Sequence, residues 1–139
     1  MSDRAFIPLS AEDIRAHLPA GLCGLDIHVF QSTDSTSTLA KALGLDGAGH
    51  GTVLLAEEQT GGRGRHGRSF YSPPGSGLYM SILLRPDCGA DMQLLTVAAA
   101  VAACRAIESS AGVTPEIKWV NDLYLSGKKI CGILAEAVF

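Results

Sequence analysis

The sequence predicts an α+β fold on three observations. Short apolar segments such as Asp26–Phe30 and Thr52–Ala56 alternate or run continuously as strands do, and turn residues bound them. The alanine-rich segment from Asp91 to about Ser110 is too long for a strand and predicts one long helix. Near the C-terminus, Ser126-Gly127-Lys128 separates two apolar segments and predicts a hairpin, whose strands are antiparallel.

Length and composition favour one compact domain spanning residues 1–139. The chain has 139 residues, and 47% of them are hydrophobic, which is enough for a core and argues against global disorder. Its formal charge of -3 gives no broad electrostatic reason to expect a nucleic-acid partner. We therefore look for local sites rather than for a charged surface.

Cysteine usage points to a reducing compartment. The four cysteines are scattered and form no CxxC pair: Cys23, Cys88, Cys104 and Cys131. Charges and prolines interrupt the N-terminal segment, so no export signal is expected there. We expect reduced, buried thiols in a cytoplasmic protein, with neither disulfides nor a cysteine metal site.

The first half of the chain is expected to mix helices and strands. Ser10 with an acid at Asp13 is typical of a helix N-cap and predicts a helix to about Leu18. The side chains of Asp34–Ser37 offer a second set of caps. The other elements expected in this half are strands at residues 26–30, 52–56 and 78–84 and a helix from about 34 to 43.

The second half is expected to hold the long helix, a short strand and the hairpin. Within the helix, Leu94–Ile107 is mostly apolar but contains Arg105 and is shorter than the ~20 residues of a membrane span. A buried amphipathic helix is the better interpretation. The strands after it are expected at residues 116–120, 123–125 and 129–138. Because Ile133–Phe139 still has strand character, we expect the chain to be truncated within an element.

The most unusual segment is Gln59–Arg68, called the Gly/Arg loop below, which holds four glycines and three arginines. Gly62-x-Gly64-x-x-Gly67 has the letters of a dinucleotide fingerprint. However, Ser69–Pro74 follows, and it cannot form the helix that this fingerprint requires. An RGG-like nucleic-acid segment is usually terminal and repeated, whereas this one is internal and single. A mobile surface loop with solvated arginines remains open.

A specific anionic ligand accounts for these residue types. Glycines allow backbone N–H groups to approach an anion closely. If the loop is extended, Arg63 and Arg65 lie on one face, and two guanidinium groups there suit a carboxylate next to a phosphate. Phe70 and Tyr71 either cover such a site or belong to the core.

A second cluster lies in Lys118–Asp122 and Gly127–Gly132. If the two segments flank a hairpin, four side chains can converge at one end of a sheet: Lys118, Asn121, Asp122 and Lys129. Lysines, an amide and a carboxylate together suit nucleotide phosphates with a magnesium ion. The plainer interpretations are an Asn-Asp turn and a core position for Trp119.

These clusters, in this order and spacing, resemble the catalytic domain of biotin–protein ligases over roughly residues 26–139. The matching segments are Asp34-Ser35-Thr36, Gln59 with Gly62-Arg63-Gly64-Arg65-His66-Gly67-Arg68, Ser72-Pro73-x-Gly75-x-Gly77-Leu78-Tyr79-Met80-Ser81, Lys118-Trp119-Val120-Asn121-Asp122 and Gly127-Lys128-Lys129-Ile130-Cys131-Gly132-Ile133-Leu134. The Gly-Arg-Gly-Arg-x-Gly-Arg motif is highly specific. Lipoate ligases share the fold but lack this motif.

The resemblance implies a fold like class II aminoacyl-tRNA synthetases and biotin ligases, with a mixed, mostly antiparallel sheet backed by helices. It implies a ligase that uses biotin, ATP and Mg²⁺. The biotin carboxylate attacks the α-phosphate of ATP and gives biotinyl-5′-AMP. A lysine of a biotin carboxyl carrier protein, or of such a domain in a carboxylase, then displaces AMP. The alternative is a non-catalytic module that binds biotin or a nucleotide or docks the carrier.

The resemblance also implies residue roles. The catalytic residues are expected to be Lys129, Arg65 and Asp122, with Lys129 stabilising charge where the anhydride forms. The residues expected to bind biotin or ATP are Ser35, Thr36, Ser37, Gln59, Gly62, Arg63, Gly64, Arg65, Phe70, Lys118, Asn121, Asp122, Lys129 and Gly132. No residue is expected to be a resident metal ligand.

The chain departs from the family pattern in two residues and in extent. Ser37 and Val120 stand where the family usually has asparagine and proline. We expect the later part of the catalytic domain, the C-terminal β-domain and the N-terminal DNA-binding domain of some members to be absent. We expect no nucleic-acid partner and no membrane partner. The further partners that we expect are a second copy of the chain, forming a homodimer, or a complementing C-terminal chain.

Overall fold

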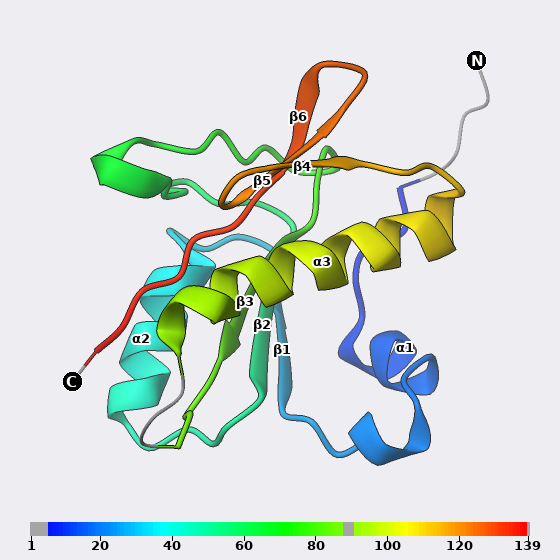
Figure 1. Cartoon of the computed structure of the whole chain (residues 1–139). Helices are drawn as coiled ribbons and strands as arrows, with labels where there is room; N and C mark the ends of the chain where they lie inside the picture. Colours follow the sequence, from blue (N-terminus) through cyan, green and yellow to red (C-terminus); the bar gives the residue numbers. More distant parts are fainter. Residues whose placement is uncertain (1–5, 88–90, 139) are drawn as a thin grey trace. The chain divides into compact units, whose positions relative to one another are not determined.

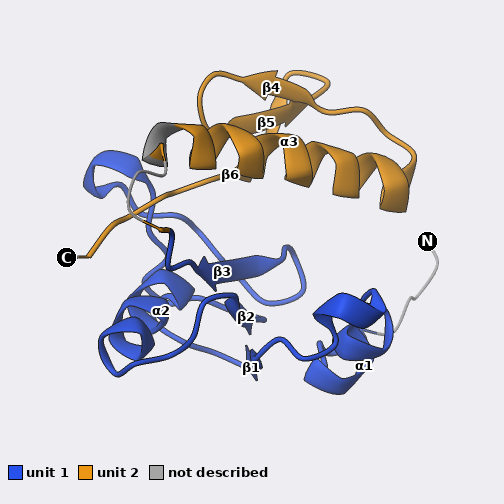
Figure 2. Ribbon diagram, turned by 60° about the horizontal axis from the view of Figure 1, so that its bottom comes forward, with its two compact units in different colours: residues 1–86 blue, residues 87–139 orange. Residues whose placement is uncertain are grey.

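The computed structural model describes residues 6–87 and 91–138, without the side chains at 92 and 93. They belong to two compact units, residues 1–86 and 87–139 (Figure 2). Each unit has its own three-stranded sheet (Figure 1). The α+β class is confirmed, and three of the four strand pairings are antiparallel, which agrees with a mixed, mostly antiparallel arrangement. The single domain remains a prediction.

The first unit is a three-stranded sheet with helices beside it. Its elements are α1 (Ala11–Ala16), the 3₁₀ turn η1 (Ala20–Leu22), β1 (Ile27–Phe30), α2 (Thr36–Leu45), β2 (Thr52–Ala56), the 3₁₀ turn η2 (Arg65–Gly67) and β3 (Tyr79–Leu83). The sheet order is β1-β2-β3, with β1 parallel and β3 antiparallel to β2. The Ser10 cap is confirmed, since its side chain accepts a hydrogen bond from the Asp13 amide.

The strand β2 is the centre of this unit because its residues are apolar on both faces. Leu54 and Ala56 are fully buried, and α2 packs against β2 and β3. Phe30 lies opposite Ala56, and Ala56 lies opposite Tyr79. The ends of β1 and β2 and the start of β3 therefore share one edge of the sheet. The segments after β1, after β2 and before β3 meet at this edge, and they contain the first set of predicted site residues.

Arg85, just after β3, ties the C-terminal end of α2 to the sheet. Its guanidinium donates to the carbonyl oxygens of Gly44 and Ala48 at 2.6 and 2.9 Å. Carbonyl groups at a helix C-terminus lack intrahelical partners, so a cation there is stabilising. We expect Arg85→Ala to lower the free energy of unfolding by about 1 kcal/mol in urea titrations. Lys41→Ala, at an exposed position of α2, should change it by less than about 0.5 kcal/mol; equal losses would contradict this role.

The second unit pairs one long helix with a three-stranded antiparallel sheet. Its elements are α3 (Met92–Ala111), β4 (Glu116–Lys118), β5 (Asp122–Leu125) and β6 (Lys128–Gly132). The predicted hairpin is confirmed, and its turn residues Ser126 and Gly127 both have positive φ, at 50° and 73°. Two such residues form the type I′ turn that matches the twist of hairpin strands.

The prediction that helix α3 is buried is wrong. Among its described side chains Ala100 is fully buried, but only 6% of the stretch Leu94–Ala111 is buried. Within this unit, α3 contacts β4 and β5. By length and composition the stretch could cross a membrane, but apolar helices of soluble proteins share this property.

The strand predicted at residues 129–138 is too long. β6 ends at Gly132, and residues 133–138 lie outside any strand. Just beyond β6, the Ile133 amide donates to the Asn121 carbonyl at 2.8 Å. Apolar, β-prone residues do not make a strand without a neighbouring strand to bond to. Phe139 lies outside the described residues.

Candidate functional site

Ser35 and Thr36 begin α2 at the sheet edge described above. Ser35 is the N-cap: its backbone is extended, and its hydroxyl accepts a weak hydrogen bond from the Thr38 amide at 3.5 Å. Ser35 and Thr36 are only 1% and 3% exposed, although they lie at a loop-helix junction. Ser37 lies in the first turn of the helix and is partly buried. Buried hydroxyl groups need partners, and Thr36 finds them across the sheet edge.

Gln59 is the centre of a polar network that joins three segments. Its Oε1 accepts from the Thr36 amide at 2.9 Å and from the Thr36 hydroxyl at 3.1 Å. Its Nε2 donates to Ser72 Oγ at 3.0 Å. The network extends at both ends, because Ser81 donates to Thr36 Oγ1 at 2.8 Å and Ser72 donates to the Phe70 carbonyl at 3.0 Å. The network thus connects side chains of α2, of the segment after β2, of the segment before β3 and of β3 itself.

This network fixes which way the Gln59 amide points. The Thr36 backbone N–H can only donate, so the atom facing it must be the oxygen Oε1. Both lone pairs of Oε1 are then used. One hydrogen of Nε2 goes to Ser72, and among the described contacts the other hydrogen has no acceptor. Gln59 therefore offers a single, pre-oriented N–H donor to a ligand.

The Gly/Arg loop is anchored at its start and closed on itself. The Thr60 and Gly61 amides donate to the Thr33 and Asp34 carbonyls at 2.9 and 2.7 Å. Further along, the Gly64 amide donates to the Arg68 carbonyl at 2.7 Å and the Phe70 amide to the Gly62 carbonyl at 2.8 Å. The loop is not extended throughout, because Arg65 begins the turn η2. Strand-like alternation therefore does not place Arg63 and Arg65 on one face.

Gly62 allows this closure by close packing. A Cβ atom at Gly62 would overlap the Phe70 carbonyl oxygen and would lie 2.6 Å from Ser72 Oγ and 3.2 Å from Gln59 Nε2. No side chain fits there, and Gly62 itself is buried. The position demands glycine because three groups of the network approach its backbone.

The aromatic and cationic side chains of this region are exposed. Arg63 and Arg65 lie at the surface, and Phe70 and Tyr71 are 41% and 87% exposed. The alternative that Phe70 and Tyr71 are core residues is therefore wrong. Both remain available to cover a ligand bound at the loop.

In the second unit, Asp122 and Lys129 meet across the hairpin. Lys129 Nζ lies 2.8 Å from Asp122 Oδ1, and both side chains are partly exposed. This contact is an ion pair rather than a well-angled hydrogen bond, since the buried Oδ1 atom has no hydrogen-bond partner among the described residues. A Cβ atom at Gly132 would lie 3.0 Å from Lys129 Cε and Nζ, so Gly132 provides the space in which the lysine lies.

The other two residues of the predicted cluster point to protein groups. Lys118 lies opposite Asp122 in the sheet, and its ammonium lies 5.1 Å from the centre of the Tyr124 ring. Asn121 is buried, and its Nδ2 donates to the Ile133 carbonyl at 3.0 Å. The predicted convergence is therefore confirmed for Asp122 and Lys129, while Asn121 holds the chain after β6.

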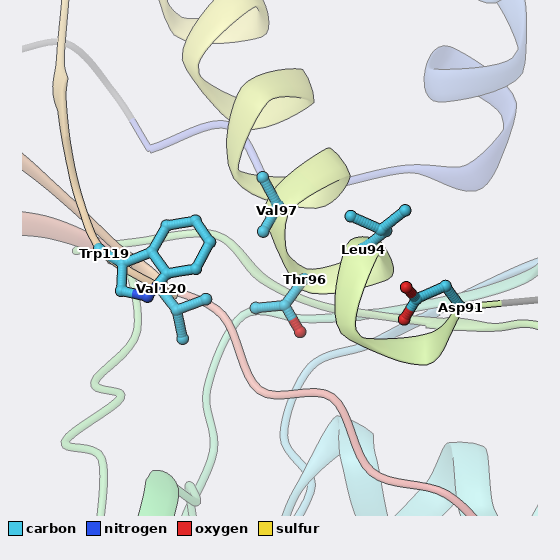
Figure 3. Close-up of a pocket in the computed structure, with 6 residues that line it drawn as sticks. All are labelled: Asp91, Leu94, Thr96, Val97, Trp119 and Val120. Atoms are coloured by element: carbon cyan, nitrogen blue, oxygen red, sulfur yellow. The ribbon is translucent and has the colours of Figure 1, made fainter.

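An open pocket of about 430 Å³ also belongs to this unit (Figure 3). It is lined by Asp91, Leu94, Thr96, Val97, Trp119 and Val120. Trp119 is 79% exposed, so the alternative that it is a core residue is wrong. The peptide bond between Trp119 and Val120 is cis.

The described residues contain free thiols and no preformed metal site. Cys23, Cys104 and Cys131 are free, and Cys88 lies outside the described residues. The expected burial is wrong for Cys23, which is exposed, and Cys104 and Cys131 are only partly buried. No group of three or more His, Cys, Asp or Glu side chains within the described ranges could hold a metal ion.

The thiol of Cys131, beside the ion pair, is expected to react slowly. Burial raises its pKa; Lys129 opposes the rise, and Asp122 and Cys104 add to it. Because the folded-state pKa exceeds the unfolded value of about 8.5, the contribution of this thiol to stability is present below that pH and is lost as pH rises through the folded-state pKa. At pH 8.5 we expect iodoacetamide to modify Cys131 more slowly than exposed Cys23, as followed by mass spectrometry. Equal rates would contradict this.

Sequence reasoning assigned no role to two residues of the network, Ser72 and Ser81. Ser72 is 2% exposed, and Ser81 points from β3 towards Thr36. Both belong to the segment that carries the resemblance, but serine is common in loops and strand ends. Only the folded path of the chain identifies Ser72 as a partner of Gln59 and Ser81 as a partner of Thr36.

Comparison with known proteins places these motifs in one family. The profile of the "Biotin/lipoate A/B protein ligase family" matches residues 29–139. The "Bifunctional ligase/repressor BirA" of Bacillus subtilis is 40% identical over 129 residues, which is 92% of this chain and 40% of that protein. The "Biotin--[acetyl-CoA-carboxylase] ligase" of Mycobacterium tuberculosis is 34% identical over 144 residues, which is 96% of this chain and 53% of that protein.

A solved structure agrees with the sequence relatives. The structure described as "Biotin protein ligase from Aquifex aeolicus in complex with biotin and ATP" matches with a TM-score of 0.71 and 34% identity, over 81% of this chain and 47% of that chain. The chain thus spans about half the length, or less, of the relatives it matches. Its sequence motifs, its fold and its profile match agree, and the chain belongs to the biotin/lipoate A/B protein ligase family.

Proposed function

We propose that the protein attaches biotin to a lysine of a biotin carboxyl carrier protein, or of such a domain in a carboxylase, through biotinyl-5′-AMP. The observation that carries this proposal is the Gln59 network beside the Gly/Arg loop. It presents oriented polar groups next to cationic ones within a single unit. Biotin has the matching layout, with a polar ureido ring at one end and a carboxylate at the other.

The ureido ring is the ligand group that suits Ser35, Thr36 and Gln59. Gln59 offers one oriented N–H, and the Ser35 hydroxyl has a proton to donate from its buried position. Two donors suit a carbonyl oxygen with two lone pairs. The dithiolane ring of lipoate has neither a carbonyl nor an N–H group, and it would leave these buried polar groups unpaired. We therefore favour biotin over lipoate. Ser37, in the same helical turn, is proposed to line this end of the site.

The Gly/Arg loop is proposed to hold the charged part of the ligand. Arg63, Arg65 and the backbone of Gly64 suit a carboxylate next to a phosphate, because guanidinium groups bind both in a bidentate way. Gly62 keeps the loop closed against Gln59. Phe70 is proposed to cover the adenylate, which needs protection from water. The loop must open to admit biotin and close to protect the anhydride.

The second unit is proposed to serve the nucleotide. In the first step, a biotin carboxylate oxygen forms a bond to the α-phosphorus of ATP while the bond to the leaving pyrophosphate breaks. Negative charge gathers on the phosphoryl oxygens, and the Lys129 ammonium is proposed to stabilise it there. Asp122 holds Lys129 by the ion pair, and Gly132 leaves room for the lysine. Lys118 and Asn121 are proposed to contact the nucleotide or the incoming lysine.

Magnesium is proposed to arrive with ATP. Mg²⁺ in nucleotide sites is commonly held by one or two carboxylates and by the substrate phosphates. Asp122 fits this role, with Arg65 and Lys129 as the other charged groups of the proposed reaction. When bound, the ion neutralises phosphate charge.

In the second step, the uncharged amine of a carrier lysine attacks the anhydride carbonyl. An amide bond forms, and AMP leaves. The carrier is proposed to be an acetyl-CoA-carboxylase-type protein, because the M. tuberculosis relative carries that description. We propose a cytoplasmic location, with no nucleic-acid or membrane partner, and a homodimer or a complementing chain as further partners.

Biotin-dependent exchange of labelled pyrophosphate into ATP tests the first step, and transfer of labelled biotin to a purified carrier domain tests the second. We expect both. Biotin binding without any exchange would replace the ligase by the alternative, a module that binds biotin or docks the carrier. The absence of biotin binding would reject both functions.

A further inference from the structure

We propose that Ser72 is a positioning residue that orients Gln59 and couples it to the segment carrying Phe70. This inference rests on the proposed function for the identity of the ligand. The contacts of Ser72 do not depend on the proposed function, and all of them lie within the first unit. Ser72 would not touch biotin; it would act through Gln59.

Ser72 is bonded to Gln59 twice. Its carbonyl oxygen accepts from the Gln59 amide at 3.0 Å, and its hydroxyl accepts from Gln59 Nε2 at 3.0 Å. The backbone bond fixes the distance between the two segments. The hydroxyl bond holds the Nε2 end of the side-chain amide, while Thr36 holds its Oε1 end. Removing the hydroxyl alone therefore keeps the backbone bond between the two segments and loosens the Nε2 end of the amide.

The directions of the neighbouring hydrogen bonds decide which bond the Ser72 hydroxyl accepts and which it donates. Because Oε1 of Gln59 faces the Thr36 amide, its NH₂ group must face Ser72. Ser72 Oγ accepts that hydrogen, so its own proton is free to go to the Phe70 carbonyl at 3.0 Å. Ser72 is 2% exposed, so water does not substitute easily for either bond.

The same hydroxyl links the ligand side of the site to its cover. The Phe70 peptide is held on both sides, since its amide donates to the Gly62 carbonyl at 2.8 Å and its carbonyl accepts from Ser72. A ligand that engages the remaining Gln59 N–H reinforces the orientation of the amide. The chain Gln59–Ser72–Phe70 then favours the closed position of the covering segment.

Nearby Ser76 provides a matched control. Its hydroxyl donates to the Pro73 carbonyl at 3.0 Å and lies 3.1 Å from the Tyr79 hydroxyl. Ser76→Ala removes a hydroxyl from the same connecting segment without touching Gln59. Ser72→Cys serves as a second test variant, because it fills the space of the hydroxyl but makes only weak hydrogen bonds.

The test measures biotin affinity by titration calorimetry in a double-mutant cycle. We expect Ser72→Ala and Ser72→Cys to weaken biotin binding about 5- to 10-fold, and Ser76→Ala less than about 2-fold. In a Gln59→Ala background, Ser72→Ala should add a clearly smaller loss, because only its bond to the Phe70 carbonyl is then left to remove. A merely structural serine would weaken binding equally in both backgrounds, and that result would overturn the proposal.

A second measurement separates this proposal from the proposed function. ¹⁵N relaxation of the Gln59 side-chain amide should show a rigid group in the wild type and in Ser76→Ala. In Ser72→Ala its order parameter should fall to about 0.6 or below. If the wild type bound no biotin, the proposed function would fail, and this change alone would support the positioning role. An amide that stays equally rigid in Ser72→Ala would overturn the role whether or not biotin binds.

Discussion

Gly62→Ala is expected to weaken biotin binding by at least about 100-fold and to lower the free energy of unfolding by about 2–3 kcal/mol. The added Cβ would overlap the Phe70 carbonyl oxygen and lie 2.6 Å from Ser72 Oγ. Neither group is the far end of a flexible side chain, so the chain must separate at the Phe70–Gly62 hydrogen bond. Opening there dismantles the network that orients Gln59.

Calorimetric titration with biotin and urea denaturation together check this expectation. Gly49→Ala is the matched control, because a Cβ at Gly49 meets nothing within 4 Å and the residue precedes β2 in the same unit. Its affinity for biotin should equal that of the wild type. Wild-type affinity in Gly62→Ala would show that closure of the Gly/Arg loop is not needed for the site.

Lys129→Ala is expected to slow biotin-dependent pyrophosphate exchange by about 10²- to 10³-fold. The lysine ammonium is proposed to stabilise charge that develops on the α-phosphate, and the Asp122 carboxylate holds it at 2.8 Å. Stability should change by less than about 1 kcal/mol, because the pair is partly exposed and solvent screens it. A large kinetic effect with a small stability effect is the signature of a residue that acts on the reaction.

Lys128→Ala removes the neighbouring exposed lysine at the start of β6 and is the control for overall charge. Its exchange rate should stay within about 2-fold of the wild type. Equal losses of exchange rate in the two variants would mean that the rate depends on the total charge of the hairpin rather than on Lys129. An unchanged rate in Lys129→Ala would remove the catalytic role assigned to this residue.

Local patterns predicted the elements well where a single physical rule decides them. The run Thr52–Ala56 is confirmed to the residue, because a continuous apolar segment between turns suits a central strand. Ser10 was expected as a cap, and Ser35 belongs to the stretch of expected caps; both have hydroxyls that accept bonds from the first helical turn. The hairpin brings the two strands together, but Asp122 lies opposite Gly132 and Lys129 opposite Tyr124, so the Asp122–Lys129 contact also needs the missing side chain at Gly132.

Features that depend on distant partners were not predictable. Residues 133–138 have strand-like composition, but they lie outside any strand of the described chain. The exposure of the apolar helix α3 was not predicted, because the composition of a helix does not say what covers it. The contact of Gln59 with Ser72 joins residues 13 positions apart, and it depends on the close approach of the chain at Gly62. The roles of the site residues remain predictions.

The most direct test of the account is a calorimetric titration of the protein with biotin and, separately, with lipoate. The oriented Gln59 amide and the buried Ser35 hydroxyl predict binding of biotin and, on the order of 100-fold, weaker binding of lipoate. Gln59→Leu should remove most of this preference. Equal affinity for the two ligands, or no binding of biotin by the wild-type protein, would contradict the account.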